Sequence, residues 1–170
     1  MAALTADGRC LGVEEPSRRS VTQLGADVHS ASTPPRISPL ALLVDSDADG
    51  RQMYAEWLRF SGFRVAEATS SKEALARVHS IRPHIITTGI GLPGEDGCSL
   101  IAQLKADVRT RDIPIIAVTG YTEPTLLQRA RRAGCDAVLT KPCLPSRLLA
   151  EIQRLLTRGH PPSADEPSAA

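Results

Sequence analysis

A chain of 170 residues has room for one domain with flanking tails, because compact domains most often contain about 100–150 residues. The formal net charge is +1, with both signs interspersed, and only 3% of the residues are aromatic. This composition supplies neither strong electrostatic attraction to nucleic acid or anionic lipid nor the stacking surfaces of single-strand binders, so neither kind of partner is expected.

The sequence contains no apolar run long enough to span a membrane and no recognisable export signal, so a cytoplasmic protein without membrane contact is predicted. The four cysteines form no pair or cluster with the spacing of a zinc site. They are predicted to be free thiols: Cys10, Cys98, Cys135 and Cys143.

The two ends of the chain differ from its middle in composition. Residues 1–38 mix Ser, Thr, Pro, Gly and charges without a helical or strand period, and residues 159–170 are rich in Pro, Ser and Ala. Such segments cannot bury enough apolar surface to order themselves. Disordered tails are therefore predicted on either side of a single domain at residues 39–158.

Within this domain, short apolar runs alternate with segments of helical period. The runs have the length of buried parallel strands and lie at residues 40–45, 63–68, 84–89, 113–119 and 136–140. Helical spacing marks three intervening apolar faces, namely Ala74, Leu75, Val78 and Ile81; Leu100, Ile101, Leu104 and Val108; and Leu144, Leu148, Leu149, Ile152, Leu155 and Leu156.

The residues between these segments have the chemistry of helix ends. Asp47 and Ser70 stand where helices should begin, and Gly62 and Gly134 stand where helices should end in a left-handed turn. Five βα units in strict alternation predict the α/β class, with a doubly wound parallel sheet and right-handed crossovers. Functional groups in such folds collect at the carboxyl ends of the strands.

Four motifs lie at or near those ends: Leu-Leu-Val-Asp-Ser-Asp at 42–47, Leu-Pro-Gly-Glu-Asp-Gly at 92–97, Ile-Ala-Val-Thr-Gly at 116–120 and Thr-Lys-Pro at 140–142. With these motifs in this order, the chain resembles the receiver domain of bacterial response regulators over about residues 40–157. The resemblance implies a five-stranded CheY-like fold with the flavodoxin strand order 2-1-3-4-5.

In the receiver family, a histidine kinase supplies a phosphoryl group to an aspartate at the end of the third strand, four residues before the proline of the Leu-Pro-Gly turn. Counting back from Pro93 reaches Gly89, and residues 84–92 contain no acid. The resemblance therefore implies an atypical receiver that lacks its phosphoacceptor.

The resemblance also concerns a metal pocket. The family carries two adjacent acids after the first strand that help to hold Mg²⁺, whereas here Asp45 is followed by Ser46. Because Mg²⁺ demands near-octahedral oxygen coordination, its binding is predicted to be weak or absent, and no other cofactor is expected. Asp47 is assigned to capping the next helix and Asp96 to the turn.

Three more family positions can be located. Ala137 is assigned to the place where receivers carry a Tyr or Phe whose rotamer reports phosphorylation. Thr119 and Lys141 match the hydroxyl and the lysine that contact the phosphoryl group. Each also has a structural interpretation, as strand-end packing for Thr119 and as a cis-proline turn or an ion pair with Asp45 for Lys141.

A basic cluster on the fourth helix, Arg129, Arg131 and Arg132, is either a solvated face or part of a partner surface. Receivers use the face formed by the fourth helix, fifth strand and fifth helix for partners and for dimers. The predicted partners are therefore a histidine kinase or a downstream regulator, and a second copy of the chain.

Three functions are compatible with these residues. The first is a non-enzymatic, phosphorylation-independent interaction module. The second is a working phosphorelay receiver with a relocated acceptor, either Asp45 or the hydroxyl of Thr88. The third is a non-catalytic small-molecule sensor that uses the space left by the missing side chain at Gly89. No acid–base pair or nucleotide-binding motif favours an enzyme.

Overall fold

The computed structural model describes residues 38–94 and 96–158, so the predicted tails at 1–38 and 159–170 lie almost wholly outside the described residues. The elements alternate strictly along the chain: β1 Leu40–Val44, α1 Ala48–Phe60, β2 Arg64–Ala68, α2 Ser71–Ile81, β3 Ile85–Gly89, α3 Gly97–Ala106, β4 Ile115–Thr119, α4 Pro124–Arg132, β5 Ala137–Thr140 and α5 Pro145–Arg158. Each predicted strand agrees with an observed strand to within two residues at either end.

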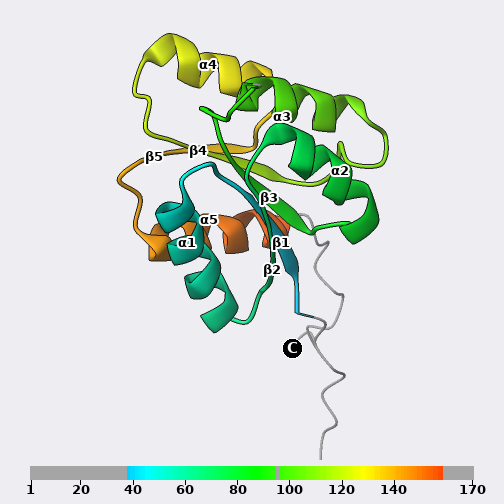
Figure 1. Cartoon of the computed structure of the whole chain (residues 1–170), viewed down its shortest axis with the longest axis vertical. Helices are drawn as coiled ribbons and strands as arrows, with labels where there is room; N and C mark the ends of the chain where they lie inside the picture. The colour runs from blue at the N-terminus through cyan, green and yellow to red at the C-terminus, as the bar shows by residue number, and fades with distance from the viewer. Residues whose placement is uncertain (1–37, 95, 159–170) are drawn as a thin grey trace, which may run out of the picture. The chain divides into compact units, whose positions relative to one another are not determined.

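The strands form one parallel sheet in the order β2-β1-β3-β4-β5, as predicted. Helices α1 and α5 cover one face of the sheet, and α2, α3 and α4 cover the other (Figure 1). Because successive side chains of a strand point to opposite faces, β1 contributes Leu42 and Val44 to the core under α2–α4 and Ala41 and Leu43 to the core under α1 and α5.

The helix boundaries follow the capping chemistry in part. The Ser70 hydroxyl accepts a hydrogen bond from the Glu73 N–H at 3.3 Å, and the Glu73 carboxylate accepts from the Thr69 N–H at 2.8 Å. Gly62 and Gly134 have φ of +90° and +102°, as predicted for helix ends. The hydrogen bonds that Glu73 makes with Ser70 and Thr69 therefore fix where α2 begins.

One cap prediction is only half right. Asp47 is the residue that precedes α1, but its side chain makes no capping hydrogen bond. The Asp96 side chain, which was assigned to the turn, caps α3 by accepting from the Cys98 N–H at 2.9 Å. A carboxylate before a helix can cap only when its rotamer points back at the N–H groups, and sequence position does not set that rotamer.

Two residues predicted to lie on buried helix faces are exposed. Helix α3 ends at Ala106, so Val108 falls in the following turn and is 70% exposed. Helix α5 begins at Pro145, so Leu144 precedes it and is 72% exposed. In both cases, the apolar spacing continued past the end of the helix.

Candidate functional site

The carboxyl edge of the parallel sheet brings together residues that are far apart in the sequence. Asp45 directly follows β1, Gly89 ends β3, Thr119 ends β4 and Lys141 directly follows β5. The Lys141 Nζ lies 2.7 Å from Asp45 Oδ2, and this ion pair joins the first and last strand ends across 96 residues of sequence. The ion-pair interpretation of Lys141 is therefore confirmed.

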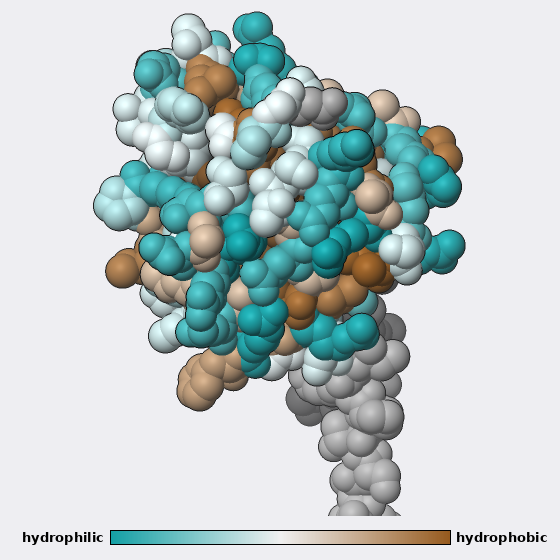
Figure 2. Space-filling view, viewed as in Figure 1, coloured by the Kyte–Doolittle hydropathy of each residue, from teal (hydrophilic) through white to brown (hydrophobic). Residues whose placement is uncertain are grey.

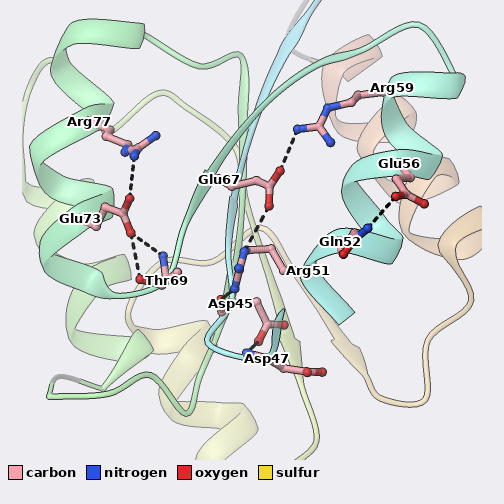
Figure 3. Close-up of polar contacts among 10 residues, drawn as sticks. All are labelled: Asp45, Asp47, Arg51, Gln52, Glu56, Arg59, Glu67, Thr69, Glu73 and Arg77. Atoms are coloured by element: carbon pink, nitrogen blue, oxygen red, sulfur yellow. Dashed lines mark hydrogen bonds and ion pairs between the residues drawn. The ribbon is translucent and has the colours of Figure 1, made fainter. Parts of the chain in front are cut away.

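Asp45 accepts hydrogen bonds from three residues of its own chain, and Figure 3 shows two of them, Asp47 and Arg51. While Oδ2 bonds Lys141, Oδ1 accepts from the Asp47 N–H at 3.0 Å and the Asp45 carbonyl accepts from the Arg51 guanidinium at 2.7 Å. The Asp45 side chain is only 14% exposed. Each of the three oxygens of Asp45 therefore accepts one hydrogen bond from the chain itself.

The Arg51 contact was not identified from the sequence. Besides its bond to Asp45, Arg51 Nε lies 3.2 Å from Glu67 Oε2 on β2, and Arg59 pairs with the other Glu67 oxygen at 2.8 Å (Figure 3). Glu67 thus holds two arginines of α1 against the sheet. The sequence signal for this contact was the spacing of Arg51 and Arg59, which lie eight residues apart and therefore on one side of α1.

Gly89 is buried, yet the backbone leaves room for a side chain at this position. A Cβ there would lie 3.6 Å from a Leu92 methyl, 3.8 Å from the Val44 carbonyl and 3.9 Å from Asp45 Cγ, all ordinary contacts. The cavity lined by Asp45, Thr88 and Gly89 measures only about 10 Å³. Such a volume holds at most one water molecule.

Thr119 serves as a junction between neighbouring loops. It is 2% exposed, its hydroxyl oxygen accepts from the Tyr121 N–H at 3.0 Å, and its carbonyl accepts from the Lys141 N–H at 2.7 Å. These bonds fasten the start of the β4–α4 loop to the end of β4 and the end of β5 beside it. They give Thr119 the structural role that the sequence left open.

Tyr121 is a second residue that sequence reasoning missed. Its ring lies so close to Gly91 that a Cβ at Gly91 would come within 3.1 Å of it. The two residues line an open depression of about 410 Å³ between the β3–α3 and β4–α4 loops. The signal in the sequence was Gly91, which stands just before the Leu-Pro-Gly turn. Glycine permits such a close approach of another side chain to the backbone.

The residues beside Asp45 do not form a magnesium site of the expected kind. Ser46 is exposed, and its hydroxyl lies 3.4 Å from the Gly91 carbonyl. Within residues 38–94 and 96–158, no three His, Cys, Asp or Glu side chains converge to hold a metal ion. A lone carboxylate already paired with Lys141 does not fit Mg²⁺. Weak or absent Mg²⁺ binding stays a prediction.

Ala137, the predicted switch position, does not face α4. Ala137 packs into the core under α1 and α5, whereas Val138 packs into the core under α2–α4, which includes Ala130 of α4. Side chains alternate along a strand, so only Val138 can follow a movement of α4. Valine, like alanine, has no ring to rotate between a buried and an exposed position.

The three arginines of α4 are all exposed. Arg129 pairs with Asp96 at the start of α3, so it is partly committed to holding α4 against the β3–α3 loop. Arg131 and Arg132 form no ion pair within the described part of the chain. The partner surface predicted here, and the homodimer through α4, β5 and α5, stay predictions.

Burial controls the titration of groups near the site. It raises the pKa of Tyr54, whose hydroxyl donates to the Cys143 carbonyl at 2.8 Å, to about 12. Burial likewise raises the pKa of the Cys98 thiol to about 11 and that of Cys143 above its usual value. The described cysteines, Cys98, Cys135 and Cys143, are free, and Cys10 lies outside the described residues.

The fold and the strand-end motifs define a receiver domain of two-component signalling. Residues 41–153 match the response regulator receiver domain family, and the chain belongs to this family. Among the described residues, no helix is long and apolar enough to cross a membrane.

Characterised relatives share this domain. The chain is 34% identical over 126 residues to the phosphate regulon transcriptional regulatory protein PhoB of Pseudomonas aeruginosa, covering 74% of this chain and 55% of that protein. It is 34% identical over 121 residues to the transcriptional regulatory protein PrrA of Mycobacterium tuberculosis, covering 71% and 51%. The chain thus spans about half the length of these relatives.

Solved structures agree with the sequence relatives. The chemotaxis response regulator CheY4 of Vibrio cholerae superposes with a TM-score of 0.66 at 28% identity, covering 69% of this chain and 98% of that one. A two-component response regulator from Clostridium difficile gives 0.67 at 26% identity, covering 71% and 98%.

Proposed function

We propose that this receiver works as a non-enzymatic protein-interaction module whose activity does not depend on phosphorylation. The observation that carries the proposal is the state of the sheet's carboxyl edge. Glycine at position 89 offers no group to phosphorylate, and Asp45 is already paired with Lys141 at 2.7 Å. The ammonium group that would neutralise a phosphoryl group is neutralised instead by a carboxylate of the same chain.

The partner is a signalling protein of the same kind of pathway, either a histidine kinase or a downstream regulator, in the cytoplasm. Arg131 and Arg132 are exposed and belong to no ion pair of the described chain, which supports a partner with an acidic surface at α4. Nucleic acid is not proposed as a partner, because the chain's net charge is only +1.

Relocated phosphorylation finds little support in the geometry. Thr88, the hydroxyl beside Gly89, is 1% exposed and donates to the Gly89 carbonyl at 3.0 Å. Both carboxylate oxygens of Asp45 already accept charge-assisted or backbone hydrogen bonds, from Lys141 and from the Asp47 N–H, which weakens them as nucleophiles. A sensor that uses the space beside Gly89 is disfavoured because the cavity of about 10 Å³ cannot admit a metabolite.

The proposal is tested by incubating the protein with acetyl phosphate and Mg²⁺, and separately with beryllofluoride. Intact-mass analysis should show no added phosphoryl group, and amide NMR signals around Thr119 and Lys141 should not move. A stable phosphoryl adduct would overturn the proposal, and mapping it to Asp45 or Thr88 would establish a relocated acceptor. Binding of the kinase or regulator should have the same affinity with and without acetyl phosphate.

A further inference from the structure

The outer surface of α1 exposes more large apolar side chains than any other described helix. Met53 is 43% exposed, Trp57 42% and Phe60 89%. The Trp57 and Phe60 rings lie side by side, with centroids 6.5 Å apart. The chain has only five aromatic residues, so two of the five stand on one exposed helix face. Core packing does not account for that placement.

The β5–α5 loop extends this surface. Leu144 is 72% exposed, and Pro145 lines two adjoining depressions of about 310 and 480 Å³, both shared with Met53. We call Met53, Trp57, Phe60, Leu144 and Pro145 the α1 patch. Figure 2, in the orientation of Figure 1, shows hydrophobic side chains protruding at the left margin and at the foot of α1, among hydrophilic neighbours.

We propose that the α1 patch is the interface of a two-fold homodimer, occupied by the same patch of a second copy of this chain. Its four large side chains expose roughly 500 Å² per copy, as judged from their exposed fractions and usual side-chain areas. A symmetric dimer would therefore bury about 1,000 Å² before its polar rim is counted, close to the lower bound of specific interfaces. An interface of this size forms a reversible dimer.

The charges around the patch suit a second copy. Asp49 and Glu56 are exposed along α1, and Arg147 is exposed two residues after Pro145. In an isologous interface each copy offers the same surface, so an acid from α1 can lie against Arg147 of the partner copy. Helix α4 is less suitable, because facing copies would bring Arg131 and Arg132 toward their own equivalents.

This inference goes beyond the proposed function, since the dimer would form whether or not the protein accepts a phosphoryl group. Trp57 is the only tryptophan in the chain, so its fluorescence reports on the patch without a label. The experiment is sedimentation velocity on the full chain from nanomolar to high micromolar concentration, with the Trp57 emission and its quenching by acrylamide measured over the same range.

We expect a reversible monomer–dimer equilibrium, together with a blue shift and reduced quenching of Trp57 as the dimer forms. Phe60→Glu should abolish both effects, because it buries a charge in the interface. Val108→Glu is the matched control, since Val108 is 70% exposed on the opposite side of the sheet and should leave dimerisation unchanged. Thermal melting of both variants verifies their folding.

Three results would overturn the inference. One is a monomer at every concentration, with Trp57 quenched freely throughout. Another is a dimer that survives Phe60→Glu in a folded protein. The third is a Trp57 that is already protected from acrylamide at nanomolar concentration, which would mean that another segment of the same chain covers the patch.

Discussion

The polar groups at the carboxyl edge of the sheet are bonded within the chain, whereas the apolar side chains on the outer face of α1 are left exposed. At the edge, Asp45 and Thr119 each bond to neighbouring groups of the chain. On α1, Trp57 and Phe60 stay exposed, with no described residue covering them. In most receivers the edge carries the chemistry. Here the edge is closed by internal bonds, and the surface that still needs a partner lies on α1.

The largest expected effect comes from opening the closed edge. Lys141→Met should lower the free energy of unfolding by about 2 kcal/mol, because Asp45 would keep a charge in a partly buried place without its partner. Urea unfolding measures the change. Lys72→Met is the matched control, since Lys72 is exposed and forms no described ion pair, and it should cost almost nothing.

A double-mutant cycle with Asp45→Asn separates the ion pair from general packing. If the pair holds the edge together, the double variant should be more stable than the sum of the two single losses predicts. Strictly additive losses would mean that Asp45 and Lys141 contribute independently, and the description of a closed edge would fail.

Two substitutions should restore a magnesium site at the carboxyl edge of the sheet. Gly89→Asp combined with Ser46→Asp should create Mg²⁺ binding, because a Cβ at Gly89 fits and would lie 3.9 Å from Asp45 Cγ. Saturating Mg²⁺ should then raise the free energy of unfolding by about 1.4 kcal/mol at tenfold excess over Kd. Thermal melting with and without Mg²⁺ measures this gain.

The parent protein is the control for this variant and should show no Mg²⁺ dependence. A Mg²⁺-dependent rise in the parent would contradict the predicted loss of metal binding. If the double variant folds and still ignores Mg²⁺, then Gly89 has been assigned to the wrong strand-end position. Without Mg²⁺, the variant should be less stable than the parent, because three clustered carboxylates repel one another.

The contrast between these regions also indicates what sequence could predict. Apolar periodicity predicted the alternation of strands and helices, and the family resemblance carried by the motifs implied the strand order and the positions of Asp45, Gly89, Thr119 and Lys141. Their meeting followed because parallel strands bring their carboxyl ends to one edge. Side-chain rotamers, and the sheet face to which a given strand residue points, could not be predicted in this way. The Asp47 side chain was expected to cap α1 and does not, and such choices depend on neighbours that spacing does not specify.

The α1 patch was missed for a related reason. Leu144 continued the apolar spacing of α5 and was therefore placed in the core, although the helix begins one residue later. Met53, Trp57 and Phe60 follow helical spacing as a core face would. Periodicity reports that side chains share a helix face, but only packing reveals whether that face is covered.

The smallest predicted effect concerns Tyr54, which connects the two regions from the inner side of α1. Its hydroxyl donates to the Cys143 carbonyl, two residues beyond Lys141, so Tyr54→Phe should cost about 1 kcal/mol at neutral pH. Burial raises the Tyr54 pKa from 10.0 to about 12, which means that folding favours the neutral phenol. The stability that Tyr54 contributes is therefore complete below pH 10 and is lost as the pH rises toward 12.

The test is the difference in unfolding free energy between the parent and Tyr54→Phe across that alkaline range. This difference should shrink as the pH rises. Above pH 10 the exposed phenol of the unfolded parent ionises, which favours unfolding of the parent, whereas the Tyr54→Phe variant has no phenol at this position. Tyr121→Phe is the control variant for loss of a phenol at an exposed site, since the side chain of Tyr121, the chain's other tyrosine, is 49% exposed. A difference that stays constant with pH would mean that the Tyr54 pKa is the same in the folded and unfolded protein, and the effect of burial on this phenol would be refuted.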